Sequence, residues 1–438
     1  MKHHSLLTKS KKIYLVLIIG LQLLFFFSIY QINDFLEIVS FKKIILLIFF
    51  QSLLILIFFS IIYERYFRIA TAFFLIILIN FLTTPFYSRI PKFITLKPNI
   101  KKQIVVNADV MPGFTGVSSL TTDFKGFRTT KAIDYKSKRN DVYRVFTIGG
   151  STTEQIYLDD KKTTSALLEK MLEEKIINKK IEVINVGVSG LRAEHHFKTF
   201  LQISKYSPDL VIFMMGINDM NKDIVSCINN SKKIKENAIL INCPSRSNSL
   251  KISFDISESL LWKFLKNTSD YNFATLDDLK PEAVIEHDDG SYYSNQNNSL
   301  NREIKKKVEF KEVSAQYKYW VDSIIKYCHS YKEIRCLFVN QASAYKDNVS
   351  NDLKRLFWMT PPNQIYTLEL KNLIQGINLY NDWLIEYSKK KKIDNCDIQN
   401  ALPPSTEYFY DDNHFNEKGA KKAAQSIFKC LSLIKNLN

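Results

Sequence analysis

The six cysteines of this sequence form no CxxC pair, and no zinc-finger spacing or RNA-binding signature occurs in its 438 residues. These absences argue against a metal centre, a thioredoxin-like redox site and a nucleic-acid-binding protein. They matter because the chain is basic, with a formal net charge of +16, and basic proteins often bind anionic partners. The lysines are scattered, with one short run at 389–392. We expect no bound metal, no cofactor and no nucleic-acid partner.

Charge is missing altogether from three long apolar runs near the N-terminus. They cover residues 13–31, 44–63 and 69–87, and each is long enough to cross a hydrocarbon core of about 30 Å as a helix. The first run is too long for a cleaved signal peptide, and no small-residue cleavage site follows it. The sequence therefore predicts three transmembrane helices within residues 13–88, after a tail of residues 1–12, with the lipid bilayer as a partner. A solvated surface beside that membrane also explains the excess of lysine.

The basic residues around these runs predict the orientation of the chain. Lys2 and Lys9 precede the first run, and Arg65 and Arg68 lie in the second connection. Both groups would be cytoplasmic with the N-terminus inside. The stretch after the third run is basic too and argues the other way, but long domains translocate largely regardless of charge. We expect a multi-pass protein of the inner (cytoplasmic) membrane, with residues 89–438 outside the cytoplasm.

All six cysteines follow the apolar runs. Their even number suits disulfides in an oxidising compartment, and a bond between Cys227 and Cys243 would close a loop. Six buried free thiols are an equally good interpretation. The remaining cysteines are Cys328, Cys336, Cys396 and Cys430.

Beyond the apolar runs the chain divides by composition. Residues 89–140 have turn signals at prolines and glycines, which indicates a linker with a small hairpin. From residue 141 onward, apolar runs of strand length alternate with helical periodicity, interrupted by a polar insertion at about 221–300. We predict strands at 144–149, 181–187, 209–216, 336–340 and 393–399, and helices at 163–178, 192–206, 303–329, 365–390 and 416–434.

Strands that alternate with helices predict an α/β fold. Five such strands give a three-layer α/β/α domain with a five-stranded parallel sheet over residues 141–438. Ligands of such sheets bind beyond the carboxyl ends of the strands. The residues that follow the predicted strands are therefore the candidates for a site: Ser151, Gly190, Asn218, Asp411 and His414.

These residue types together suit acyl transfer. A serine hydroxyl becomes a nucleophile when a histidine removes its proton and a carboxylate orients that histidine. The N–H groups of Ser151 and Gly190 and the side-chain amide of Asn218 would then bind the oxyanion. His414 is distinctive because it follows Asp411 by three residues and comes just before a helix, whereas the other six histidines lie in the tail, the insertion or predicted helices.

Each of these residues also has a purely structural interpretation. Ser151 would serve as the N-cap of a helix after a tight turn, and Gly190 would be an ordinary turn glycine. Asn218 with its neighbour would cap a helix. Asp411 and Asp412 would be turn residues before the last helix. Single motifs of this kind do not decide between structure and catalysis.

Taken in order, the four motifs resemble the blocks of the SGNH hydrolases, also called GDSL-type esterases. The blocks are GGST at Ser151, NVGVSG ending at Gly190, GIND at Asn218, and the D-x-x-H of Asp411 and His414. The resemblance implies a flavodoxin-like sheet, Ser151 as nucleophile, His414 as base and Asp411 as its orienting carboxylate, with Gly190 and Asn218 as oxyanion donors. Two positions depart from the common pattern, because Gly150 replaces an aspartate and Gln155 stands where a glycine is usual.

The resemblance spans lipases, arylesterases, carbohydrate acetylesterases and some O-acetyltransferases. With a membrane anchor, it implies an esterase that removes acyl groups, such as acetyl, from a cell-envelope glycan or lipid. One alternative is an O-acyltransferase that modifies a cell-surface polysaccharide with the help of envelope-polysaccharide assembly proteins. Another is a membrane-tethered binding module with a relict site. Four aromatic residues are candidates for stacking on sugars: Trp262, Tyr292, Tyr293 and Trp358.

Overall fold

The computed structural model describes residues 93–230, 240–243, 271–273, 285–288 and 304–433. The three predicted transmembrane runs lie outside these residues. Within the described part of the chain, no helix is both long and apolar enough to cross a membrane.

A five-stranded parallel sheet forms the centre of the domain and confirms the predicted sheet. Its order is β13-β11-β6-β4-β5, with every neighbouring pair parallel. The first strand of this sheet, β4, therefore lies inside the sheet rather than at its edge, and the strand order reverses between β4 and β6. Loops that leave those two strands diverge and open a crevice at their carboxyl ends. The strands are β4 (Val142–Gly149), β5 (Lys180–Asn185), β6 (Leu210–Met214), β11 (Arg335–Val339) and β13 (Asp394–Cys396).

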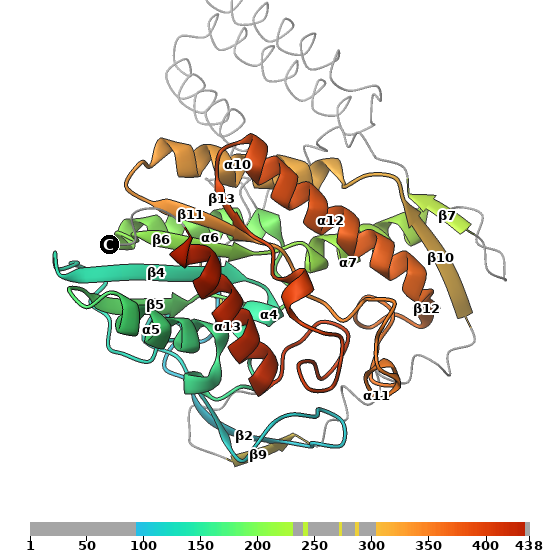
Figure 1. Ribbon diagram of the computed structural model, residues 1–438, viewed down its shortest axis with the longest axis horizontal. Helices are drawn as coiled ribbons and strands as arrows, with labels where there is room; N and C mark the ends of the chain where they lie inside the picture. The colour runs from blue at the N-terminus through green and yellow to red at the C-terminus, as the bar shows by residue number, and fades with distance from the viewer. Residues whose placement is uncertain (1–92, 231–239, 244–270, 274–284, 289–303, 434–438) are drawn as a thin grey trace, which may run out of the picture. The chain divides into compact units, whose positions relative to one another are not determined.

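The central strands are apolar because helices cover both faces of the sheet. All five residues of β6 are buried, as expected for a strand without a solvated face. On one face, α5 packs against α13, and on the other α6 packs against α10, while α12 contacts both β11 and α7. Figure 1 shows these helix layers on either side of the sheet. Their bounds are α5 (Thr164–Lys175), α6 (Ala193–Ile203), α7 (Ile217–Asn230), α10 (Ala315–Ser330), α12 (Leu370–Lys390) and α13 (Glu417–Ser432).

Two predicted helices begin later than expected. The segment predicted as a helix over 303–329 starts instead with strand β10 (Ile304–Phe310), which pairs with β7 (Leu240–Cys243) and β12 (Tyr366–Leu368). The helix begins only after Ser314, whose hydroxyl accepts the backbone N–H of Tyr317 as an N-cap. The lysines of β10 suit a helix locally, and the strand pairing overrides that preference. Likewise, β12 precedes α12 where a helix from 365 was predicted.

The beginning of the predicted insertion is also helical. Residues 221–230 continue α7, because Ile217, Met220, Ile224 and Ile228 recur at helical spacing and are buried. The abundance of Asn and Asp in this stretch hid that periodicity. Most of the remaining insertion lies outside the described residues.

Residues 93–140 are part of the folded domain rather than a linker. They contain β1 (Phe93–Thr95) and the antiparallel pair of β2 (Lys101–Val106) and β3 (Ser118–Thr121). Phe127 belongs to the main core, and Arg128 forms a bridge with Asn185 at the end of β5. Short elements complete the described chain: β8 (Tyr271–Phe273), β9 (Ile285–Asp288), α11 (Asn351–Lys354), and 3-10 turns at Asp160–Lys162, Ser204–Tyr206 and Gln399–Ala401.

Disulfides rather than free thiols account for the cysteines of the described residues. Cys328 bonds to Cys336, and Cys396 bonds to Cys430. Cys227 is disulfide-bonded as well, whereas the side chain of Cys243 lies outside the described part of the chain. The alternative of six free thiols is therefore wrong.

Candidate active site

Ser151 lies at an abrupt change from strand to helix. Strand β4 ends at Gly149, and the short helix α4 (Ser151–Glu154) follows with Gly150 as its N-cap residue. A Cβ on Gly149 would lie 2.0 Å from the Thr153 hydroxyl, and one on Gly150 would lie 2.4 Å from the amide nitrogen of Asn218. The turn is thus too tight for side chains at either position. Ser151 is the first residue of the helix rather than its N-cap, which leaves its hydroxyl available for other contacts.

The structure brings Ser151, His414 and Asp411 together from the two ends of the domain. The Nε2 atom of His414 lies 2.8 Å from the Ser151 hydroxyl oxygen, and its Nδ1 atom lies 2.6 Å from a carboxylate oxygen of Asp411. Asp411 is fully buried, while the imidazole is 16% exposed. A serine, an imidazole and a carboxylate in this order can generate a serine nucleophile.

The D-x-x-H turn holds the histidine through the same carboxylate. The other oxygen of Asp411 accepts the backbone N–H groups of Asn413 and His414, each at 2.8 Å. The ring of Tyr410 stacks on the imidazole at a centroid distance of 5.5 Å. The ring centroid of Trp358 lies 6.0 Å from that of the imidazole. The imidazole is therefore fixed in both position and tilt.

The neighbouring Asp412 has a separate role. Its carboxylate accepts the Tyr345 hydroxyl at 2.7 Å and the backbone N–H groups of Trp358 and Met359 at 3.0 and 2.9 Å. Burial, together with the nearby Asp411 charge, raises the pKa of Asp412 to about 6. Asp412 thus anchors the loop around Trp358, and only Asp411 is bonded to the imidazole.

The electrostatic environment of His414 favours its charged form. Burial lowers the pKa of His414, but the Asp411 carboxylate outweighs burial, so the pKa lies above the ordinary value of 6.5. With its Nδ1 proton donated to Asp411, the neutral ring presents the Nε2 lone pair to Ser151. The same carboxylate stabilises the imidazolium that forms when the serine proton is taken up.

Asn218 lies against the turn before Ser151, because its amide nitrogen is 2.4 Å from where a Cβ of Gly150 would be. Gly190 has a φ of +74° and open space where a Cβ would be. Within the described part of the chain, neither its N–H nor that of Ser151 has an acceptor. The Asn218 amide donates one hydrogen to the carbonyl of Leu191 at 2.9 Å, which leaves its second hydrogen for a ligand. Ser151, Gly190 and Asn218 thus each keep one N–H that could be donated to a ligand.

A family model for GDSL-like lipases and acylhydrolases matches residues 145–427 of this sequence. The chain belongs to this family. As a GDSL-like hydrolase it acts on ester bonds. No curated protein matches the sequence.

Several solved structures resemble this GDSL-like hydrolase distantly. A protein described as a GDSL-like lipase from Parabacteroides merdae is 10% identical, with a TM-score of 0.35 over 69% of this chain and 100% of that one. A variant of an acetylxylan esterase from Geobacillus stearothermophilus is 11% identical, with a TM-score of 0.35 over 67% and 95% of the two chains. An α/β hydrolase from the metagenome of Lake Arreo, Spain, is 12% identical, with a TM-score of 0.34 over 66% and 95%. Likenesses at this level carry no argument about what this chain acts on.

Gln155 stands where the family pattern usually has a glycine. Its backbone adopts a conformation that glycine takes up more easily than other residues. Its φ is +55°, a left-handed conformation that costs a non-glycine residue about 1–2 kcal/mol. Its side-chain amide compensates by pairing with Thr164, accepting the backbone N–H at 2.6 Å and donating to the hydroxyl at 2.8 Å. The guanidinium of Arg128 donates to the Gln155 carbonyl at 2.8 Å. Side-chain contacts thus replace the freedom of a glycine at this position of the GDSL-like hydrolase.

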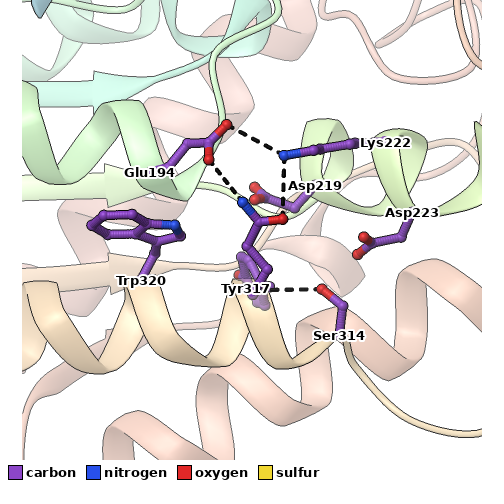
Figure 2. Close-up of a pocket in the computed structure, with 8 residues that line it drawn as sticks. Glu194, Asp219, Lys222, Asp223, Ser314, Tyr317 and Trp320 are labelled. Carbon is purple, nitrogen blue, oxygen red and sulfur yellow. Dashed lines mark hydrogen bonds and ion pairs between the residues drawn. The ribbon is translucent and has the colours of Figure 1, made fainter. Parts of the chain in front are cut away.

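Asp219 of the GIND block also holds the loop that follows Gly190. The Asp219 carboxylate accepts the backbone N–H of Ala193 at 3.1 Å, and burial raises the pKa of Asp219 to about 8. Figure 2 shows Asp219 in the same pocket as Lys222 and Glu194. Lys222 interacts with Glu194 at 3.4 Å, and Gln316 bonds to both of them. Lys222, Glu194 and Gln316, which line this pocket, are thus paired with one another.

Sequence reasoning missed two residues that support the site, Glu154 and Arg128. Glu154 is 1% exposed and lies three residues after Ser151 in the same helix. Its S-x-x-E spacing is a readable signal, since it resembles a capping box. Arg128 is 4% exposed and donates to the carbonyls of Glu154, Gln155 and Leu158. No local pattern marks Arg128, because its contacts are more than 20 residues away.

Proposed function

We propose that this GDSL-like hydrolase is a membrane-anchored serine esterase that removes acyl groups, such as acetyl, from a glycan or lipid of the cell envelope. The hydrogen-bonded chain from Ser151 through His414 to Asp411 carries the proposal. Together with the family membership, it assigns the nucleophile to Ser151, the base to His414 and the orienting carboxylate to Asp411.

The reaction follows from these positions. His414 Nε2 takes the proton of the Ser151 hydroxyl as the oxygen attacks the acyl carbon. The oxyanion that forms accepts the N–H groups of Ser151 and Gly190 and the free amide hydrogen of Asn218, and each such donor contributes about 3–4 kcal/mol to the transition state. His414 then protonates the departing alcohol oxygen, which leaves an acyl group on Ser151. A water molecule, deprotonated by the same imidazole, releases the acid and restores the serine.

The proposed location rests on the apolar runs and on the disulfides. Three charge-free runs precede the catalytic domain, and the second connection between them is basic, which supports a location of residues 89–438 outside the cytoplasm. The disulfides Cys328–Cys336 and Cys396–Cys430 support an oxidising compartment. An enzyme tethered there would meet acylated envelope glycans and lipids.

The aromatic surroundings of the serine limit how a sugar could bind. Trp358 is only 7% exposed and packs with Met111 and Tyr410, so it forms a wall beside His414 rather than an open stacking platform. The other aromatic candidates, Trp262, Tyr292 and Tyr293, lie outside the described residues. We therefore propose recognition of the acyl ester itself and assign no stacking platform for the sugar.

The full chain in detergent should hydrolyse p-nitrophenyl acetate and label with a fluorophosphonate. Ser151→Ala should abolish both reactions without changing the melting temperature, whereas Ser330→Ala, at an exposed helix serine, should retain both. Normal hydrolysis by Ser151→Ala would refute the nucleophile assignment. A folded wild-type chain that neither hydrolyses nor labels would indicate a binding module.

Analysis of the products distinguishes water from a sugar hydroxyl as the acceptor of the acyl group. An acetylated envelope polysaccharide should lose acetate on incubation with the wild-type chain. Transfer of acetate to an added glycan acceptor, beyond release of free acid, would instead support the acyltransferase alternative. The predicted topology is tested by protease treatment of intact spheroplasts, where the catalytic domain should be cleaved without breaching the inner membrane.

A further inference from the structure

The loop after β5 docks along the helix that carries Ser151. The Asn185 amide donates to the carbonyl of Thr153 at 2.6 Å and accepts the N–H of Gly187 at 2.9 Å. A Cβ on Gly187 would lie 2.5 Å from the backbone nitrogen of Glu154. The loop can therefore approach the helix this closely only with glycine at position 187. The close approach brings the loop within reach of the Glu154 side chain.

Glu154 ties this helix to the residue before Gly190. One carboxylate oxygen of Glu154 accepts the backbone N–H of Ser189 at 2.7 Å and also the Ser189 hydroxyl. The side chain is 1% exposed, so water does not compete for these bonds. Hydrogen bonds to a buried carboxylate are among the strong ones in proteins, and this pair fixes the peptide next to the Gly190 N–H.

On this side of Gly190, Glu154 holds Ser189, the residue directly before it, and the N–H of Val188 donates to the carbonyl of Gly149 at 3.1 Å. On the far side, Asn218 holds the carbonyl of Leu191 and Asp219 holds the N–H of Ala193. Gly190 itself is exposed and at positive φ, so its own conformation does little to fix the direction of its N–H. The direction depends on the peptides at both ends.

We propose that Glu154 is a positioning residue for the oxyanion hole, which couples the helix of Ser151 to the loop that presents the Gly190 N–H. The inference rests on the proposed function, in which that N–H binds the oxyanion. Because Glu154 and Ser151 belong to the same helix turn, one rigid unit then sets both the attacking oxygen and the donor. A displacement of that donor weakens transition-state binding while leaving the binding of the substrate in its ground state unchanged.

Replacing the ester carbonyl oxygen by sulfur separates positioning from general damage, because sulfur is a weak hydrogen-bond acceptor. The wild-type full chain should prefer an acetate ester strongly over the matching thionoester. Glu154→Gln should lower kcat for the ester about 10- to 100-fold at nearly constant KM, less than the loss of a whole donor. The thionoester rate should fall much less, so the preference shrinks. Ser189→Ala, which removes only the hydroxyl donor, should shift the preference in the same direction by a smaller factor.

Glu169 provides a matched control. It is 4% exposed, and its carboxyl group accepts the N–H of Val183 at 3.0 Å, so Glu169→Gln also replaces a buried carboxyl group that holds a backbone N–H. It should lower the melting temperature without changing the preference between ester and thionoester. An equal loss of both substrates in Glu154→Gln, or a shift in Glu169→Gln of the same size, would overturn the proposal.

Amide exchange tests the same positioning without any turnover. Glu154→Gln should speed hydrogen exchange in peptides that cover residues 186–192, and Glu169→Gln should leave that segment unchanged. If the wild-type chain hydrolysed no ester, the proposed function would fail, yet faster exchange at 186–192 would still support the coupling by Glu154. Unchanged exchange in Glu154→Gln and Ser189→Ala would refute it.

Discussion

The replacement of Asp411 by asparagine is the most discriminating perturbation of the site. One oxygen of Asp411 accepts the backbone N–H groups of Asn413 and His414, and an asparagine oxygen can keep both bonds. The other oxygen, 2.6 Å from Nδ1, would become an NH2 group. The turn should therefore survive in Asp411→Asn while the orientation of the imidazole tautomer is reversed.

The magnitude follows from that reversal. An amide that donates to Nδ1 leaves the proton on Nε2, which then points at Ser151 and cannot accept its hydrogen. A wrong tautomer of this kind costs about 10⁴-fold in kcat in a serine hydrolase, or ~5.5 kcal/mol. The acid limb of kcat/KM should also move. In the wild type activity should appear as the imidazole loses its proton with rising pH, and the midpoint should lie above 6.5, because Asp411 raises the pKa of His414 against the effect of burial. Without the carboxylate the midpoint should shift to lower pH.

The assay is hydrolysis of p-nitrophenyl acetate from pH 5 to 9, with Asp412→Asn as the matched control. Asp412 is equally buried but bonded to Tyr345 and to two backbone N–H groups. Its replacement should cost about 1–3 kcal/mol of stability and much less activity. An Asp411→Asn enzyme within tenfold of the wild type, or a larger loss of kcat in Asp412→Asn, would refute the assignment.

Three further predictions concern the donor, the buried acid and a disulfide. Gly150→Ala should displace the Asn218 amide, which lies 2.4 Å from the new Cβ position, and lower kcat about 10- to 100-fold; an unchanged kcat in a folded variant would contradict this close approach. Burial raises the pKa of Asp219 to about 8 from 3.8, so its contribution to stability is complete below pH ~4 and is lost as pH rises through ~8, by at most ~6 kcal/mol. Urea unfolding of Asp219→Asn should lack that component, and equal pH slopes would argue against a raised pKa. Replacing Cys396 and Cys430 together by serine opens a loop of 34 residues and should lower the free energy of unfolding by about 3–4 kcal/mol; an unchanged urea midpoint would show that the bond contributes little.

The sheet and the four site motifs could be read from the sequence because their signals are local and strong. The apolar run at 209–216 had to be buried on both faces, and the two glycines before Ser151 marked a turn with no room for side chains. Once the strands were placed, the rule that sites lie at their carboxyl ends brought Ser151 and His414 to the same edge. That step needed only the positions of the strands along the chain.

The missed features depend on partners far away in the chain. The lysine-rich residues 304–310 have helical propensity, and only their pairing with β7 and β12 makes them a strand. Residues 93–140 resemble a linker in sequence because prolines and glycines interrupt their apolar residues, although Phe127 enters the core. Contacts of this kind carry no periodicity that a sequence can show.

Arg128 has a practical consequence for anyone who wishes to isolate the enzyme. Its guanidinium donates to the carbonyls of Glu154, Gln155 and Leu158, just after Ser151 in the chain, and pairs with Asp160 at 2.7 Å, although it precedes the family match at 145–427. A recombinant fragment trimmed to the family boundaries would therefore lose the only cation that closes this turn in the described residues. A fragment worth purifying must therefore include Arg128, so the family boundary is not the boundary of the working enzyme.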